Sequence, residues 1–150
     1  MNRVLITTLA LLTLGVGKAT AEDIGQIKKS TGSVVLERAA KAMPAPAGTR
    51  VQVGDTVVTG ADGSVGITLS DNSLLSAGPN SRLDLARYAF DTTTHQGNFD
   101  ANLRKGTLSM VSGKLAKQSP DAVRVITPSS VLAVRGTEFF VKVDADADGK

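Results

Sequence analysis

The sequence predicts an all-β domain of short strands and hairpins, arranged as a roll, a sandwich or a short solenoid. Three observations lead to this prediction. Apolar and polar residues alternate in many short segments, as in strands that bury one face. Turn residues separate these segments at intervals of roughly ten residues. No segment shows sustained helical periodicity.

The alternation is clearest at Val65, Ile67 and Leu69, which would face the core while the residues between them face solvent. Residues 98–106 are expected to continue the sheet, residues 39–48 to form a loop or an extended edge, and residues 91–97 to form an exposed connection. The predicted strands are Ser33–Glu37, Thr56–Thr59, Ser64–Leu69, Ser73–Ala77, Ser81–Arg87, Thr107–Val111, Val123–Thr127, Val131–Val134 and Glu138–Val143.

The turns between these segments have their own chemistry. Ala61–Gly63 and Leu69–Asn72 each lie between two predicted strands, and their Asp-Gly and Asp-Asn pairs tolerate the left-handed backbone of tight hairpins. Gly78–Ser81 is predicted as another turn because it begins Gly-Pro. Pro128 is expected to end a strand, since proline cannot donate to a ladder.

The first 21 residues have the pattern of a secretory signal peptide. Met1–Arg3 gives a positive start, Val4–Val16 is apolar, and Ala19 and Ala21 are the small residues that a signal peptidase reads. We expect cleavage after Ala21, which leaves residues 22–150 as an exported, periplasmic β domain with no stable membrane span. A retained anchor is the alternative, but this run of 13 residues, interrupted by threonine and glycine, falls short of the ~20 that a spanning helix needs.

Composition excludes several kinds of site. The chain has no cysteine or tryptophan and only one histidine and one tyrosine, so it has no disulfide, no cysteine-zinc site and no platform of aromatics for stacking bases. Cleavage would remove Arg3 and Lys18, leaving 15 basic against 14 acidic residues. A nearly neutral surface gives no electrostatic reason to bind nucleic acid. We expect no cofactor.

An ordered set of short motifs resembles the FecR family of periplasmic domains. The first motif, Gly54–Ser64, reads Gly-Asp-Thr-Val-Val-Thr-Gly-Ala-Asp-Gly-Ser, and Asp71–Ser73 and Gly78–Ser81 follow it. Thr127-Pro128 and then Val134–Phe139, which reads Val-Arg-Gly-Thr-Glu-Phe, complete the set. The resemblance runs from Gly54 to Val143 and implies an all-β fold in the periplasm.

The sensor members of this family begin with a cytoplasmic segment that binds a sigma factor, and they end in a further domain. This sequence has only Met1–Arg3 before its apolar run and ends at Lys150. We therefore expect a stand-alone FecR-like domain without the sigma-binding segment. The resemblance implies an interaction module and not the sigma-factor mechanism.

Three residues are candidates for binding a partner: Arg135, Thr137 and Asp55. Arg135 lies beside a glycine between two apolar segments, and its planar set of donors suits a carboxylate or a partner backbone. The alternative interpretation is internal, with Arg135 paired to a carboxylate such as Asp55. Asp55 is interpreted first as a carboxylate that closes a turn.

The end of the chain carries the first half of a calcium-loop pattern, with Asp144, Asp146 and Asp148 at alternate positions before Gly149. A complete loop places a glutamate at its twelfth position, which lies beyond Lys150. We therefore expect no specific metal site, and interpret this segment as an acidic tail with weak calcium binding as the alternative.

No catalytic residue is predicted. His95 lies in a threonine-rich loop with no nucleophile motif around any serine, and Tyr88 and Phe90 are expected to pack in or beside the core. Two functions remain open. The first is a non-catalytic module that binds another envelope protein through a strand edge or through Arg135. The second is a small ligand-binding or structural module of the envelope. The oligomeric state is not predicted.

Overall fold

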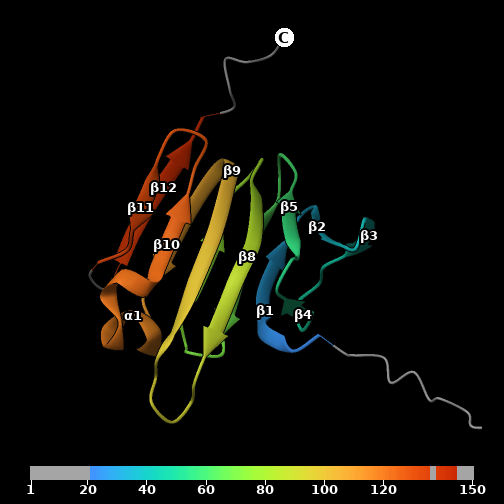
Figure 1. Ribbon diagram of the computed structural model, residues 1–150. Helices are drawn as coiled ribbons and strands as arrows, with labels where there is room; N and C mark the ends of the chain where they lie inside the picture. Colours follow the sequence, from blue (N-terminus) through green and yellow to red (C-terminus); the bar gives the residue numbers. More distant parts are fainter. Residues whose placement is uncertain (1–20, 136–137, 145–150) are drawn as a thin grey trace, which may run out of the picture.

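Alternating apolar residues, many of them β-branched, favour strands that bury every second side chain. The computed structural model describes residues 21–135 and 138–144, and strands make up most of them (Figure 1). The strands are β1 Asp23–Thr31, β2 Val34–Arg38, β3 Lys41–Pro44, β4 Arg50–Gln52, β5 Thr56–Thr59, β6 Ser64–Leu69, β7 Leu74–Ala77, β8 Arg82–Phe90, β9 Gly97–Val111, β10 Val123–Ile126, β11 Val131–Ala133 and β12 Glu138–Val143.

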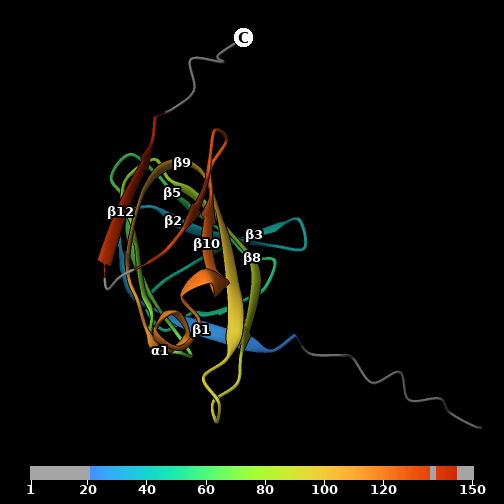
Figure 2. The ribbon, with the colours of Figure 1, turned by 60° about the vertical axis from the view of Figure 1, so that its left-hand side comes forward.

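The strands form one curled, mostly antiparallel sheet whose two halves enclose the core (Figures 1 and 2). One half has the order β12-β9-β7-β6-β1-β4, and the other has the order β3-β2-β5-β8-β9-β10-β11. The long strand β9 belongs to both halves. Among the described strands, β10 and β9 are the one parallel pair.

Successive strands pass from one half to the other at glycine corners. The chain turns from β1 into β2 at Gly32, and β9 bends at Gly106. Their φ angles are +65° and +91°, in the left-handed region that favours glycine. A Cβ atom at Gly32 would collide with the backbone of Asp62, and one at Gly106 would collide with Ser81. These corners let the chain continue from one half of the sheet into the other, so that the inner faces of both halves bury the core.

The core lies between the two halves of the sheet. Leu83, Leu85, Phe99 and Leu103, on the adjacent strands β8 and β9, are almost entirely inaccessible to solvent. Burying one such side chain contributes roughly 1.5–3 kcal/mol. The core therefore holds β9 firmly, and with it the C-terminal strands that pair to it.

The all-β prediction is confirmed, and β5, β6 and β12 have the predicted bounds. Residues 98–106 continue the sheet, and β3 forms an extended edge within residues 39–48. Four elements were not predicted: β1, β4, a short helix, α1 Lys114–Gln118, and the 3-10 turn that follows it, η1 Pro120–Ala122. The predicted turns at Asn72 and Asn80 have the left-handed backbone, with φ of +66° and +53°.

The predicted signal peptide occupies residues outside the described ranges, apart from Ala21. In residues 21–135 and 138–144, the helices are too short and too polar to cross a membrane.

Candidate binding site

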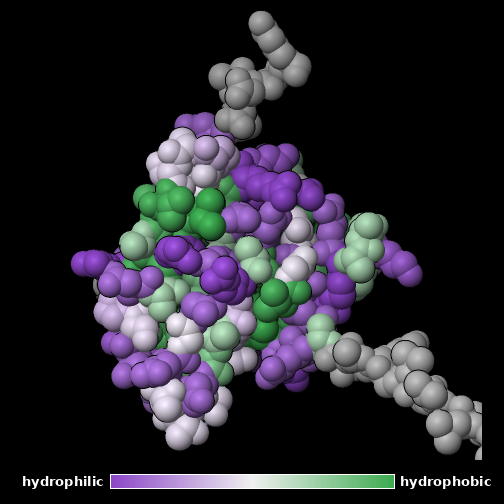
Figure 3. Space-filling model, viewed as in Figure 1, coloured by the Kyte–Doolittle hydropathy of each residue, from purple (hydrophilic) through white to green (hydrophobic). Residues whose placement is uncertain are grey.

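Strands β10 and β11 form a small projecting unit at one edge of the sheet. β10 pairs with the first part of β9, and a turn in which the Thr127 amide donates to the Ser130 carbonyl (2.8 Å) leads into β11. β11 pairs only with β10 among the described strands, and all three of its residues are exposed. Figure 3 shows hydrophobic side chains at the surface where Figure 1 places β10 and β11. Val131 is the most exposed of them, at 63%.

Arg135 follows this unit at the surface. Val134, just before it, is buried and donates its amide to the Val123 carbonyl at 2.9 Å, which fixes the chain at this point. The Arg135 Nη2 atom then lies 2.6 Å from Oδ1 of Asp121 in η1, and the two side chains are 72% and 76% exposed. Exposed ion pairs contribute little to stability. Breaking the pair with Asp121 therefore costs little free energy, and the Arg135 guanidinium can bind another carboxylate in its place.

Asp55 is buried in the turn between β4 and β5. Its carboxylate accepts two hydrogen bonds from Arg38, at 2.8 and 2.7 Å, and one from the Gln52 amide at 2.7 Å. The hydrogen bond to Asp55 raises the pKa of Arg38 above its usual value. These contacts are those of a carboxylate that closes a turn. A ligand role for Asp55 stays a prediction.

The structure does not bring Arg135 and Asp55 together. Arg135 pairs with a carboxylate, as the internal interpretation proposed, but the partner is Asp121 and not Asp55. The cause is topological, because β5 and β10–β11 lie on opposite sides of β8 and β9 in the strand order. Thr137 lies outside the described residues.

A buried polar cluster around Asp71 fixes the start of α1, which leads toward the site. Sequence reasoning noted Asp71 as part of a turn and of a FecR-like motif, and did not predict the cluster. The fully buried Asp71 carboxylate accepts hydrogen bonds from the Ser73 amide (3.1 Å) and hydroxyl (2.6 Å), the Tyr88 hydroxyl (3.3 Å) and the Leu115 amide (3.2 Å). The Leu115 contact ties the start of α1 to the hairpin between β6 and β7. The only sequence signal was the Asp-Asn-Ser motif itself.

Two arginine–carboxylate clusters lie on the outer face of the sheet and link the neighbouring strands β8, β9 and β10. Asp100 lies between Arg124, at 3.0 Å, and Arg87, at 3.6 Å. Asp84 accepts from Arg104 at 2.7 Å. The Asp100 side chain is 8% exposed, so the arginines shield a nearly buried charge. Because Arg124 belongs to β10, this cluster fixes the projecting unit to the body of the domain.

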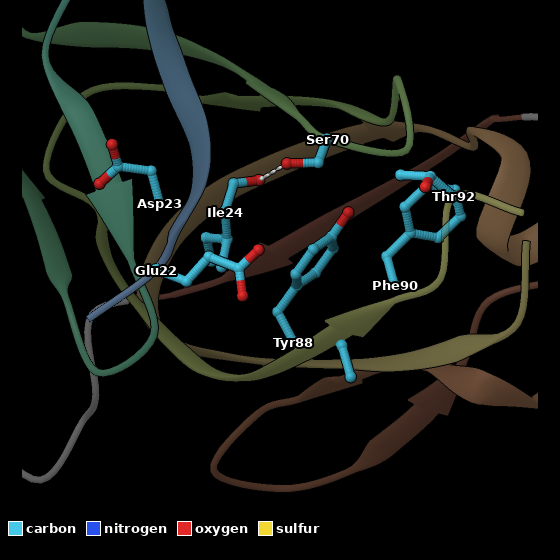
Figure 4. Close-up of a pocket in the computed structure, with 8 residues that line it drawn as sticks. Glu22, Asp23, Ile24, Ser70, Tyr88, Phe90 and Thr92 are labelled. Atoms are coloured by element: carbon cyan, nitrogen blue, oxygen red, sulfur yellow. Dashed lines mark hydrogen bonds between the residues drawn. The ribbon is translucent and has the colours of Figure 1, made fainter. Parts of the chain in front are cut away.

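Tyr88 and Phe90 pack against the core, as expected, and the hollow that they line is small. Tyr88 meets Phe99 edge to face, with ring centroids 5.8 Å apart, and Phe90 stacks on His95 at 5.9 Å. In Figure 4, Tyr88 lies between Glu22 and Phe90 at a hollow of about 150 Å³. Ligand pockets are usually ~300 Å³ or larger. Burial raises the pKa of the Tyr88 hydroxyl above its usual value, and the nearby Asp71 charge adds to the effect.

The acidic tail lies mostly outside the described residues, which include Asp144 but not Asp146 or Asp148. Asp144 is exposed, and its Oδ1 atom forms an ion pair with Lys142 Nζ at 3.0 Å. In the described part of the chain, no three His, Asp or Glu side chains are grouped so that they could hold a metal ion.

Comparison with known families gives a match that begins just before β5. The family model described as FecR protein matches residues 55–149, which is more than half of the chain. The chain belongs to the FecR family. The family match covers the strands from β5 to β12, including the β10–β11 unit and Arg135 of this FecR domain. Comparison with curated proteins gives no match, and comparison with solved structures gives none.

Proposed function

We propose that this FecR domain is an exported, non-catalytic module that binds another protein of the cell envelope through the edge of β11 and through Arg135. The observation that carries the proposal is the exposed edge of β11, which is followed at once by an arginine whose ion pair is exchangeable. Membership of the FecR family supports a regulatory or signalling role.

The chemistry of the surface defines the partner. An edge strand offers unpaired N–H and C=O groups to an extended segment of another chain, which adds as a further strand. Val131 and Leu132 offer apolar contacts to that strand. Arg135 offers a planar set of donors to a carboxylate on the same partner. The partner segment is therefore extended, partly apolar and acidic at one end.

The single histidine and the single tyrosine of the chain are engaged in internal contacts. The single histidine stacks on Phe90, and the hydroxyl of the single tyrosine is within hydrogen-bond distance of Asp71. These contacts support a binding role over a catalytic one.

The signal-like N-terminus supports export with cleavage after Ala21. Sequencing the N-terminus of the periplasmic protein should find Glu22 first, and a protein that begins at Met1 would contradict export with cleavage.

Photo-cross-linking in living cells tests the binding surface. A photoreactive amino acid in place of Val131 should give a discrete cross-linked product that contains a second envelope protein. The same amino acid in place of Thr93, in the exposed loop that joins β8 to β9, is the matched control. Arg135→Ala should reduce the Val131 product at least several-fold. Equal products from the two positions, or a product that Arg135→Ala does not change, would contradict the proposal.

A further inference from the structure

A second open edge lies at β12, on the other half of the sheet. β12 pairs with the end of β9 on one side, and no described strand pairs with its other side. Natural proteins protect such edges with charges, bulges or covering segments, because an open edge recruits other strands. β12 does carry charges, at Glu138 and Lys142, but the residue at the centre of its exposed face is Phe140, which is 66% exposed.

Phe140 belongs to an apolar patch on the outer face of this half. It lies opposite Ser109 of β9, diagonally adjacent to Val111, and Val111 pairs across to Leu74 of β7. Val111 and Leu74 are 39% and 46% exposed. The patch therefore crosses three strands and reaches the open edge, where an adjoining strand would extend it.

The charges on β12 are arranged symmetrically about Phe140. Glu138 lies two residues before it and Lys142 two residues after it, so all three side chains point to the same exposed face. An antiparallel strand of the same sequence, centred on Phe140, places each Glu138 opposite Lys142 of the second copy. It also places the two Phe140 rings opposite each other. Both cross-strand pairs are favourable.

Other pairings of two β12 strands are electrostatically worse. Centring the antiparallel pair on Val141 places Glu138 opposite Asp144, and Phe140 opposite Lys142. A parallel, in-register pair places each Glu138 beside its own copy. Like charges directly opposite each other are destabilising. The sequence of β12 therefore complements itself in one register.

We infer that this protein forms a two-fold symmetric dimer in which β12 of one copy pairs antiparallel with β12 of a second copy, centred on Phe140. The interface is isologous, as in most homodimers. It joins one half of the sheet to its counterpart in a continuous sheet and covers the exposed Phe140. It uses a different strand from the partner site proposed above, so neither proposal depends on the other.

Charge reversal tests the register. The protein is purified in the form that the cell produces after export. Its sedimentation velocity should show a dimer whose fraction rises with protein concentration. Glu138→Lys and Lys142→Glu should each weaken the dimer at least tenfold, because symmetry places two like-charge pairs in every interface. The double variant Glu138→Lys/Lys142→Glu should return the dissociation constant to within a few-fold of the original. Lys41→Glu, on the distant edge strand β3, is the control for charge reversal and should have no effect.

Cross-linking tests the centre of the interface, since the chain has no cysteine of its own. Phe140→Cys should form a disulfide-linked dimer under mild oxidation. Leu74→Cys, on the same patch but two strands from the edge, should not. A wild-type protein that is monomeric at every concentration would overturn the inference. So would equal cross-linking of the two cysteine variants, or a double charge swap that fails to restore the dimer. These experiments use the pure protein, so their outcome is separate from any failure to find an envelope partner.

Discussion

Arg38 and Asp55 form a two-point ion pair in which Nε and Nη2 donate to the two carboxylate oxygens at 2.8 and 2.7 Å. The Asp55 side chain is 1% exposed, and the Arg38 side chain is 32% exposed. The arginine therefore covers a buried charge, and the same carboxylate closes the turn before β5 by accepting from the Gln52 amide. The pair links the end of β2 to the turn in which the family match begins.

Removal of Arg38 should destabilise the domain, because it leaves the Asp55 charge buried without its cation. We expect Arg38→Ala to lower the free energy of unfolding by about 2–4 kcal/mol, measured by urea denaturation. Arg82→Ala is the matched control. Its pair with Glu37 joins side chains that are 32% and 36% exposed, so the loss should stay below about 1 kcal/mol. Equal losses in the two variants would argue against a special role for the buried pair.

Tyr88 should remain protonated in the folded protein well above the pH at which a free tyrosine ionises. Its pKa is raised in the folded state, so the folded state retains a proton that the unfolded state loses above about pH 10. Stability is thus fully present below pH 10 and falls as the pH rises further. Because Tyr88 is the only tyrosine, absorbance at the phenolate band reports it alone. A folded protein that titrates near pH 10 would refute this prediction.

The Asp71 cluster should be essential for the start of α1. Asp71→Ala leaves the Leu115 amide and the Ser73 hydroxyl without their buried acceptor, so we expect a loss of roughly 3 kcal/mol in the free energy of unfolding. Hydrogen exchange at the Leu115 amide should accelerate more than exchange at Val57 in β5. Unchanged protection at Leu115 would show that the carboxylate does not hold the helix.

The corner at Gly106 should tolerate no side chain. Gly106→Ala places a Cβ against Ser81 in addition to imposing a left-handed backbone on alanine, so we expect a loss of roughly 2–4 kcal/mol in stability. Gly54→Ala separates the two effects. Its φ of +88° is similar, but its Cβ would meet nothing within 4 Å, so the loss should be about 1 kcal/mol. Thermal unfolding of the two variants measures the difference.

Alternation in the sequence predicts strands only where the ladder is regular. Val65, Ile67 and Leu69 are all buried, and β6 has the predicted bounds. In β1 the buried residues Ile24 and Ile27 are three positions apart, and the register shifts on both sides of the strand. A strand with such irregularities shows no period of two, which is why β1 was not predicted.

The candidate binding site was predictable only where it depends on local sequence. An exposed arginine after a short strand is visible in the sequence, and its pairing with some carboxylate was anticipated. Which carboxylate it meets depends on η1, a three-residue turn with no periodic signal, which places Asp121 beside Arg135. The Asp71 cluster joins residues up to 44 positions apart, and no local pattern encodes contacts at that distance.

The long strand β9 has the widest consequence for how the molecule behaves. It pairs with four strands, β8 and β10 along its first part and β7 and β12 along its last part. A ligand strand held at β11 and a second copy held at β12 would both pull on this one central element. Mechanical load or rigidity gained at either margin would thus pass directly to the other, through the strand that they have in common.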